Sequence, residues 1–139
     1  HIPFASLSPE IAERTVTLLG PTKTFNIAGL KIGFIVAQNA GLRERLQRVG
    51  AGLVTPPNVM AQTAARAVYT AGGAWLGGTL EYLKRNRERV DGFMRTYLPD
   101  ARYASPEGTY LAWLELSSLN LGDELYSTLL GCGVGLNEG

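Results

Sequence analysis

Apolar residues follow two kinds of pattern along this chain: short continuous runs, and longer stretches with helical spacing. The runs at 14–19 and 31–37 are rich in β-branched and aliphatic residues and stop at turn-forming residues. Both of these runs predict short buried strands. The segment 42–49 has helical spacing, with its three apolar residues on one face and its charges elsewhere, and it predicts an amphipathic helix.

The middle of the chain predicts two more helices. A proline pair at 56–57 breaks the chain, and Asn58 can then cap a helix that runs to about Tyr69. Two glycines at 72–73 are expected to end that helix. A long amphipathic helix is predicted over 74–98, since its apolar positions recur with helical spacing.

In the last part of the chain, predicted strands alternate with a helix. An apolar run predicts a strand over 109–116, followed by a helix over 123–130 and a last strand over 134–136. Cys132, between two glycines, is expected to be a small buried residue. Strands that alternate with helices indicate an α/β or α+β layered architecture.

Composition excludes several classes of function. The 13 basic and 12 acidic side chains give a net charge of +1, which offers no electrostatic reason to expect nucleic acid or a membrane as partner. No apolar run approaches the roughly 20 residues that span a bilayer. The single cysteine cannot form an internal disulfide, which fits a reducing compartment, and a cytoplasmic location is expected. No metal-ligand spacing, nucleotide-binding loop or Ser-His-Asp arrangement is found.

Lys23 is the residue with the clearest chemical interest. It directly follows the turn at 20–21 that ends the first predicted strand. A lysine at such a place is usually a solvated surface residue. However, a loop at the end of a strand is also where α/β proteins place ligand-binding groups. The amine of a desolvated lysine can attack an aldehyde and form a Schiff base.

The neighbours of Lys23 carry a family resemblance. The pattern Ser/Thr-Lys, five residues, Gly, one residue, a cation, one residue, Gly runs from Thr22 to Gly33. It is similar to the pyridoxal-5′-phosphate (PLP) lysine signature of class I/II aminotransferases. The sequence T-K-T-F-N-I-A-G-L resembles the branch that contains cystathionine β-lyases and other cysteine C–S lyases. Stretches at 1–4, 55–58 and 106–113 support that branch.

The resemblance implies an α/β fold of the PLP-transferase type (aminotransferase fold type I). Residues 1–82 would be part of the large PLP-binding domain, and residues 83–139 the bridging helix and part of the small C-terminal domain. Lys23 would hold PLP as a Schiff base and then act as general base on the substrate's α-proton. Thr22 would donate a hydrogen bond to the cofactor phosphate. Lys31 stands where most of the superfamily has an arginine that grips this phosphate.

The chain also departs from the family pattern. Gly20 stands where many relatives have a hydroxyl residue, so that phosphate contact is not expected here. By resemblance, the aspartate that pairs with the pyridinium nitrogen lies upstream of His1, and the arginine that binds the substrate carboxylate lies downstream of Gly139. We therefore expect a fragment of a longer protein, close to inactive in isolation and prone to self-association through exposed sheet edges.

The resemblance favours a cystathionine β-lyase or related C–S lyase, which catalyses β-elimination at cysteine-type thioethers through a Schiff base on Lys23. The alternative is a PLP-dependent aminotransferase acting on an amino acid, because both reactions begin with the same Schiff base and the same proton abstraction. A non-catalytic domain of the same fold is a third interpretation. The expected partners are a small-molecule amino-acid substrate and, in the full-length protein, a second identical subunit.

Overall fold

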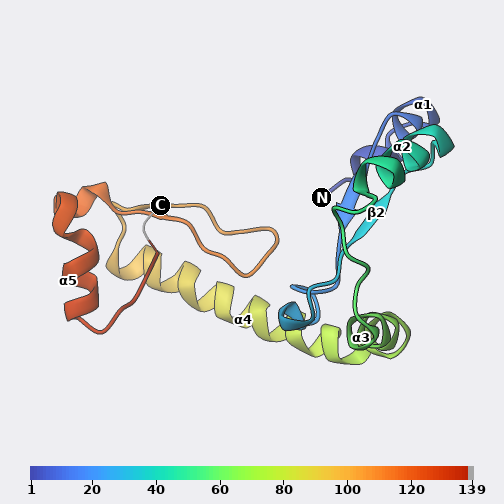
Figure 1. Cartoon of the computed structure of the whole chain (residues 1–139). Helices are drawn as coiled ribbons and strands as arrows, with labels where there is room; N and C mark the ends of the chain where they lie inside the picture. Colours follow the sequence, from blue (N-terminus) through green and yellow to red (C-terminus); the bar gives the residue numbers. More distant parts are fainter. Residues whose placement is uncertain (138–139) are drawn as a thin grey trace. The chain divides into compact units, whose positions relative to one another are not determined.

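A computed structural model describes residues 1–137 of the chain. These residues form two compact units, His1–Leu80 and a second that begins at Glu81 (Figure 1). None of the described helices is both long enough and apolar enough to cross a membrane.

The first unit contains short helices around a two-stranded sheet. Strand β1 (Thr17–Leu19) pairs antiparallel with β2 (Phe34–Val36), with Leu18 opposite Ile35. The helical elements are η1 (Phe4–Ser6), α1 (Pro9–Glu13), η2 (Ala28–Leu30), α2 (Ala40–Gly50) and α3 (Val59–Ala71), where η marks a 3₁₀ helix.

The predicted helices of this unit are confirmed, and asparagine side chains explain where they begin. Asn58 Oδ1 accepts a hydrogen bond from the amide N–H of Ala61 at 2.9 Å, as expected for the cap of α3. Helix α2 begins two residues earlier than predicted because Asn39 caps it, accepting from the N–H of Leu42 at 3.0 Å. Gly72 ends α3, its N–H donating to the carbonyl of Val68 at 2.9 Å.

Both predicted strands of this unit begin later than the apolar runs suggest. The run at 14–19 is paired only from Thr17, because Thr15 closes the end of α1: its hydroxyl donates to the carbonyl of Ile11 at 2.6 Å. The run at 31–37 is paired only from Phe34, because Lys31 ends η2 with left-handed backbone at φ 51°. The assignment of Lys31 to the start of a strand is therefore wrong.

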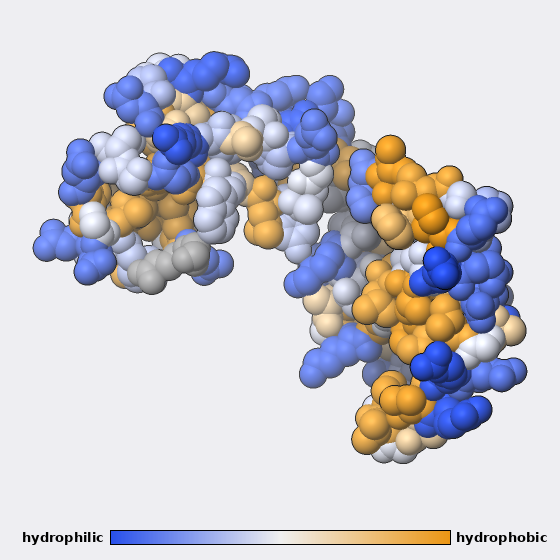
Figure 2. Space-filling model, turned by 90° about the horizontal axis from the view of Figure 1, so that it is seen from above, coloured by the Kyte–Doolittle hydropathy of each residue, from blue (hydrophilic) through white to orange (hydrophobic). Residues whose placement is uncertain are grey.

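The sheet of the first unit leaves apolar side chains uncovered. The buried core of this unit is small and consists of Ile32, Ala61 and Ala65, with Leu30 packed against them. By contrast, Leu18 is 74% exposed and Ile35 is 60% exposed, although both lie in the sheet. Figure 2 shows apolar side chains gathered over the right-hand part of the surface, where this unit lies. The described residues therefore leave much of this sheet uncovered.

Helix α4 (Gly73–Tyr97) begins in the first unit and continues into the second, and it matches the predicted long helix closely. In the second unit β3 (Arg102–Tyr103) pairs antiparallel with β4 (Leu114–Glu115). The remaining elements are η3 (Ser117–Leu119), η4 (Gly122–Glu124) and α5 (Leu125–Gly131). The helix predicted over 123–130 is thus formed mainly by α5.

Three sequence predictions for the second unit are wrong. The strand predicted over 109–116 is reduced to β4, and Thr109, with φ 66°, interrupts extended backbone. Residues 134–136 form no strand, because the N–H of Val134 donates to the carbonyl of Leu129 at 2.9 Å and completes the end of α5. Cys132 is exposed instead of buried, since it lies at this open helix end.

Candidate functional site

Lys23 lies on a tightly closed turn, residues 21–27, which we call the lysine turn. The amide N–H of Phe25 donates to the carbonyl of Pro21 at 2.9 Å. The N–H of Ile27 donates to the carbonyl of Thr22, also at 2.9 Å. The second bond closes six residues, as at the end of an α-helix that finishes in a Schellman motif. The backbone around Lys23 is therefore fixed by local hydrogen bonds.

The sequence of the lysine turn suits this geometry. Pro21 is fully buried and has a restricted φ, so it fixes the entry to the turn. Asn26 adopts φ 55°, a left-handed conformation that asparagine tolerates better than most residues. The side chain of Lys23 is exposed, and its amine forms no ion pair within residues 1–137. The described residues thus hold the backbone of Lys23 and leave its amine free.

Aromatic rings hold the lysine turn against the helices. The ring of Phe25 lies 5.9 Å from that of Tyr69 on α3, edge to face at 78°, and 6.3 Å from that of Trp75 on α4. Phe34, from β2, lies 6.1 Å from Tyr69. We call these four residues the aromatic cluster. Figure 1 shows the turn, in blue, beside the start of α4.

Two glycines allow close approaches around this site. A Cβ atom on Gly72 would lie 2.8 Å from Cε1 of Phe25, which is closer than two carbon atoms can pack. A Cβ on Gly20 would lie 2.9 Å from the carbonyl oxygen of Ile32 and 3.3 Å from Cα of Gly33. A side chain at position 20 would therefore clash with this backbone.

The three predicted site residues fall on neighbouring segments. Thr22 is half-buried on the lysine turn beside Lys23, and its hydroxyl makes no hydrogen bond in the described part of the chain. Lys31 is exposed at the end of η2, and its N–H donates to the carbonyl of Ala28 at 3.2 Å. Thr22 and Lys23 are thus on one turn, whereas no hydrogen bond among residues 1–137 joins the Lys31 side chain to either.

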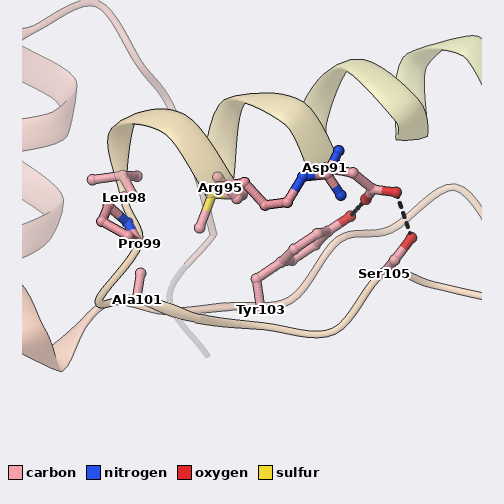
Figure 3. A pocket seen from close by; sticks show the side chains of 8 residues that line it. Asp91, Arg95, Leu98, Pro99, Ala101, Tyr103 and Ser105 are labelled. Carbon is pink, nitrogen blue, oxygen red and sulfur yellow. Dashed lines mark hydrogen bonds between the residues drawn. The ribbon is translucent and has the colours of Figure 1, made fainter.

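Sequence reasoning missed a second polar site, in the second unit. The hydroxyl of Tyr103 donates to Oδ1 of Asp91 at 2.7 Å, and the hydroxyl of Ser105 donates to Oδ2 at 2.9 Å (Figure 3). We call these three residues the polar clamp. It joins α4 to the segment that contains β3. The sequence gives little indication of this site. Asp91 lies four residues from both Arg87 and Arg95, a spacing that is also typical of solvent-exposed charged residues on a helix.

The polar clamp shifts the acidity of its members. The hydroxyl of Tyr103 is the largest cause that holds the pKa of Asp91 below its ordinary value, and Ser105 and the neighbouring arginines act in the same direction. Burial, followed by the bond to Asp91, raises the pKa of Tyr103. The clamp borders an open cavity of about 290 Å³, lined by Asp91, Met94, Arg95, Leu98, Pro99, Ala101, Tyr103 and Ser105.

The two sites have different chemical capacities. Both carboxylate oxygens of Asp91 already accept hydrogen bonds and its carboxyl stays ionised, so the clamp is suited to hold structure together. In the lysine turn, by contrast, the amine of Lys23 forms no ion pair and the hydroxyl of Thr22 forms no hydrogen bond among residues 1–137, so both can bind a ligand. Within residues 1–137, no group of three or more His, Cys, Asp or Glu side chains could hold a metal ion.

Comparisons with known proteins show the family of the chain. The family model of aminotransferase class I and II matches residues 2–134. The chain is 39% identical over 138 residues to cystathionine beta-lyase PatB of Bacillus subtilis. The matched stretch covers 96% of this chain and 35% of that protein. The chain therefore spans about a third of the length of this relative.

Two solved structures share the fold. A PLP-bound putative aminotransferase from Clostridium difficile matches all of this chain and 37% of its own, with a TM-score of 0.91 and 36% identity. A PLP-bound C–S lyase from Staphylococcus hominis matches 94% of this chain and 34% of its own, with a TM-score of 0.81 and 31% identity.

Proposed function

Because the chain belongs to the aminotransferase class I and II family, we propose that it carries the cofactor lysine, Lys23, of a PLP-dependent C–S lyase. The reaction is β-elimination at cysteine-type thioethers, of which cystathionine is the example that the similarity to PatB suggests. The observation that carries this proposal is the lysine turn: its backbone is fixed while the Lys23 amine stays uncommitted. The chain has part of the family's fold, PLP fold type I.

The side chains around the lysine turn fit the chemical groups of PLP. The primary amine of Lys23 suits an aldehyde, the hydroxyl of Thr22 can donate to a phosphate, and the ammonium of Lys31 matches its negative charge. In the described residues neither lysine is neutralised by an acidic side chain. Lysine acts on phosphate as a point charge, without the paired donors of arginine.

Within the proposed reaction the residues of this chain hold the cofactor and move a proton. PLP, when bound, supplies an aldehyde for the lysine and a conjugated ring that accepts electrons from the substrate's α-carbon. When PLP is bound, the Lys23 amine would hold it and would later accept the substrate's α-proton as general base. The electron pair left by that proton would expel the thiolate from the β-carbon, and the remaining three-carbon enamine would hydrolyse to pyruvate and ammonia. Thr22 and Lys31 would orient the cofactor through its phosphate.

The proposal extends to the protein as a whole. We assign residues 1–82 to the large PLP-binding domain and residues 83–139 to the bridging helix and the small domain; the division into compact units after Leu80 is compatible with this assignment. We also propose that the full-length protein acts on a small amino-acid substrate, forms a homodimer and is located in the cytoplasm. The exposed apolar side chains of β1 and β2 are compatible with cover from residues outside this chain.

An aminotransferase is the second candidate function. The family model includes aminotransferases, and the solved structure with a TM-score of 0.91 is a putative aminotransferase. Both functions use Lys23 in the same way, so they are distinguished by their products and not by the residues of this chain.

The test is a trapping experiment on the full-length protein that contains this chain. Borohydride reduces a carbon–nitrogen double bond between Lys23 and PLP to a stable amine, which peptide mass spectrometry then locates. Cystathionine is added in a parallel sample and pyruvate is assayed. An adduct on Lys23 with pyruvate release supports a C–S lyase, and an adduct without pyruvate favours transamination. Absence of an adduct on Lys23 contradicts both.

A further inference from the structure

We propose that Phe25 and Gly72 act as a positioning pair for Lys23, with the ring of Phe25 seated in the space that Gly72 leaves at the junction of α3 and α4. This inference rests on the proposed function, since it assigns the direction of the Lys23 amine to the packing of a ring two residues further along the chain.

The fit between ring and glycine is the first observation. Gly72 lies at the end of α3, and α4 begins at the next residue. A Cβ there would approach Cε1 of Phe25 to 2.8 Å and would also meet the carbonyl oxygen of Val68. The ring therefore occupies the place that a side chain at position 72 would need. Of the two glycines at this junction, only Gly72 is crowded, because a Cβ on Gly73 would meet nothing within 4 Å among the described residues.

The second observation is that the ring is held from two further sides. Tyr69 meets it edge to face at 5.9 Å, and Trp75 lies 6.3 Å away. These two residues lie on either side of Gly72 in the sequence, one on α3 and the other on α4. The ring of Phe25 thus contacts both helices that meet at the glycine.

The third observation connects the ring to the lysine. Phe25 lies two residues after Lys23, and its N–H donates to the carbonyl of Pro21, so the bond closes the backbone across Lys23. In the described residues the amine itself forms no ion pair that would orient it. The direction of the side chain therefore depends on the backbone of the turn, which is held by its local hydrogen bonds together with the packing of the Phe25 ring.

Positioning of this kind matters for a reaction at a fixed carbon atom. The amine must stand within reach of the aldehyde carbon and later of the substrate's α-proton. A displacement of about 1 Å can cost on the order of 100-fold in rate. A loosened Phe25 is expected to lower the rate of proton transfer more than the affinity for substrate, because the group that it displaces is the amine that accepts the proton.

The test replaces Phe25 with leucine in the full-length holoenzyme. Phe93→Leu is the matched control, because Phe93 also stacks on a second ring, that of Tyr97 at 4.8 Å, but lies in the second unit. Four quantities are measured: kcat, KM, the fraction of Lys23 trapped by borohydride at limiting PLP, and hydrogen exchange of the 22–27 peptide. Trp75→Leu, at a half-exposed site, serves as second variant if Phe25→Leu does not fold.

The expected result is a decrease of about tenfold in kcat and in trapped adduct for Phe25→Leu, the size of one to two lost aromatic contacts. KM should change less, and exchange over 22–27 should become faster. Phe93→Leu should stay within about twofold of the unmodified protein. Equal values for Phe25→Leu and Phe93→Leu, with Lys23 still trapped in the unmodified protein, would overturn the positioning role alone. No adduct on Lys23 in the unmodified protein would instead defeat the proposed function.

Discussion

The two units of the chain hold their irregular segments by opposite means. The lysine turn of the first unit is fixed by backbone hydrogen bonds and by the aromatic cluster, without a charged partner in the described residues. The segment at 102–106 in the second unit is instead held by the polar clamp on the carboxylate of Asp91. Ring packing does not depend on protonation, whereas the bonds to a carboxylate do.

This difference suits the role proposed for each segment. A lysine that must gain and lose protons is best held by groups that do not titrate with it. In addition, a free amine beside a fixed carboxylate would be drawn into an ion pair. The polar clamp has no such constraint, because it joins α4 to the segment of β3 and includes no lysine. The comparison therefore predicts where substitutions change chemistry, where they change stability, and where they change only the response to pH.

The largest effect is expected from Lys23→Ala. Loss of the proposed general base should lower kcat by about 100- to 10,000-fold. The free energy of unfolding should change by only about 0.5 kcal/mol or less, because the side chain is exposed and unpaired in the described residues. Steady-state kinetics and urea denaturation of the full-length protein measure both. A large loss of stability would show that the lysine also holds the fold.

Gly72→Ala should act in the reverse way, through stability. The added methyl group meets Phe25 and the carbonyl of Val68, and overpacking of this kind costs about 1–3 kcal/mol. Gly77→Ala is the control, because it lies within α4 and meets nothing within 4 Å in the described residues. That change should stabilise the helix by up to about 1 kcal/mol. Urea midpoints that move in the same direction would contradict the crowding at Gly72.

Asn26→Val tests the backbone of the lysine turn with a smaller expected cost. At φ 55° a β-branched residue should lose about 1–2 kcal/mol of stability, and exchange over 22–27 should become faster. Asn26→Gly is the control, since glycine adopts this conformation without strain. If valine and glycine behave alike in urea denaturation, the left-handed residue does not constrain the turn.

Asp91→Asn is expected to have the smallest effect at neutral pH and a distinct effect in acid. The pKa of Asp91 is lowered by folding, so its contribution to stability is present above the unfolded value of about 3.9 and is lost as pH falls through the folded value. After correction for intrinsic exchange rates, the protection of amides over 102–106 should therefore decrease as pH falls below about 3.9 in the unmodified protein and change less in the variant. Asp100→Asn is the control, an exposed aspartate with no ion pair in the described residues.

The helices were the part of the fold that sequence could predict, because their signals are local. Asn58 caps α3 and the apolar spacing of α4 is continuous, so both boundaries were nearly right. Strands depend on partners far away in the chain and on single backbone angles. The left-handed backbone of Lys31 and of Thr109 shortens two apolar runs, and neither angle is visible in the pattern of hydrophobic residues.

For the site, the sequence predicted a candidate amine but did not reveal the residues that pack around it. The Thr22-Lys23 pattern pointed to the lysine turn through family resemblance, and its role stays a prediction. The aromatic cluster joins Phe25, Phe34 and residues on α3 and α4, and no local pattern brings such positions together. Gly72 was identified correctly as a helix end, but its second role depends on a ring that arrives from another part of the chain.

The order of folding follows from how the lysine turn is closed. Its two backbone bonds join residues four and five positions apart, and loops of about ten residues close within about 100 ns. The contact between Phe25 and Trp75 joins residues 50 positions apart, a separation that slows its formation. During folding the turn should thus be sampled many times before its ring is captured. The slow step is then the arrival of the helix junction, so substitutions at Gly72, whose contact with Phe25 forms in that step, should slow folding more than they change the formation of the turn.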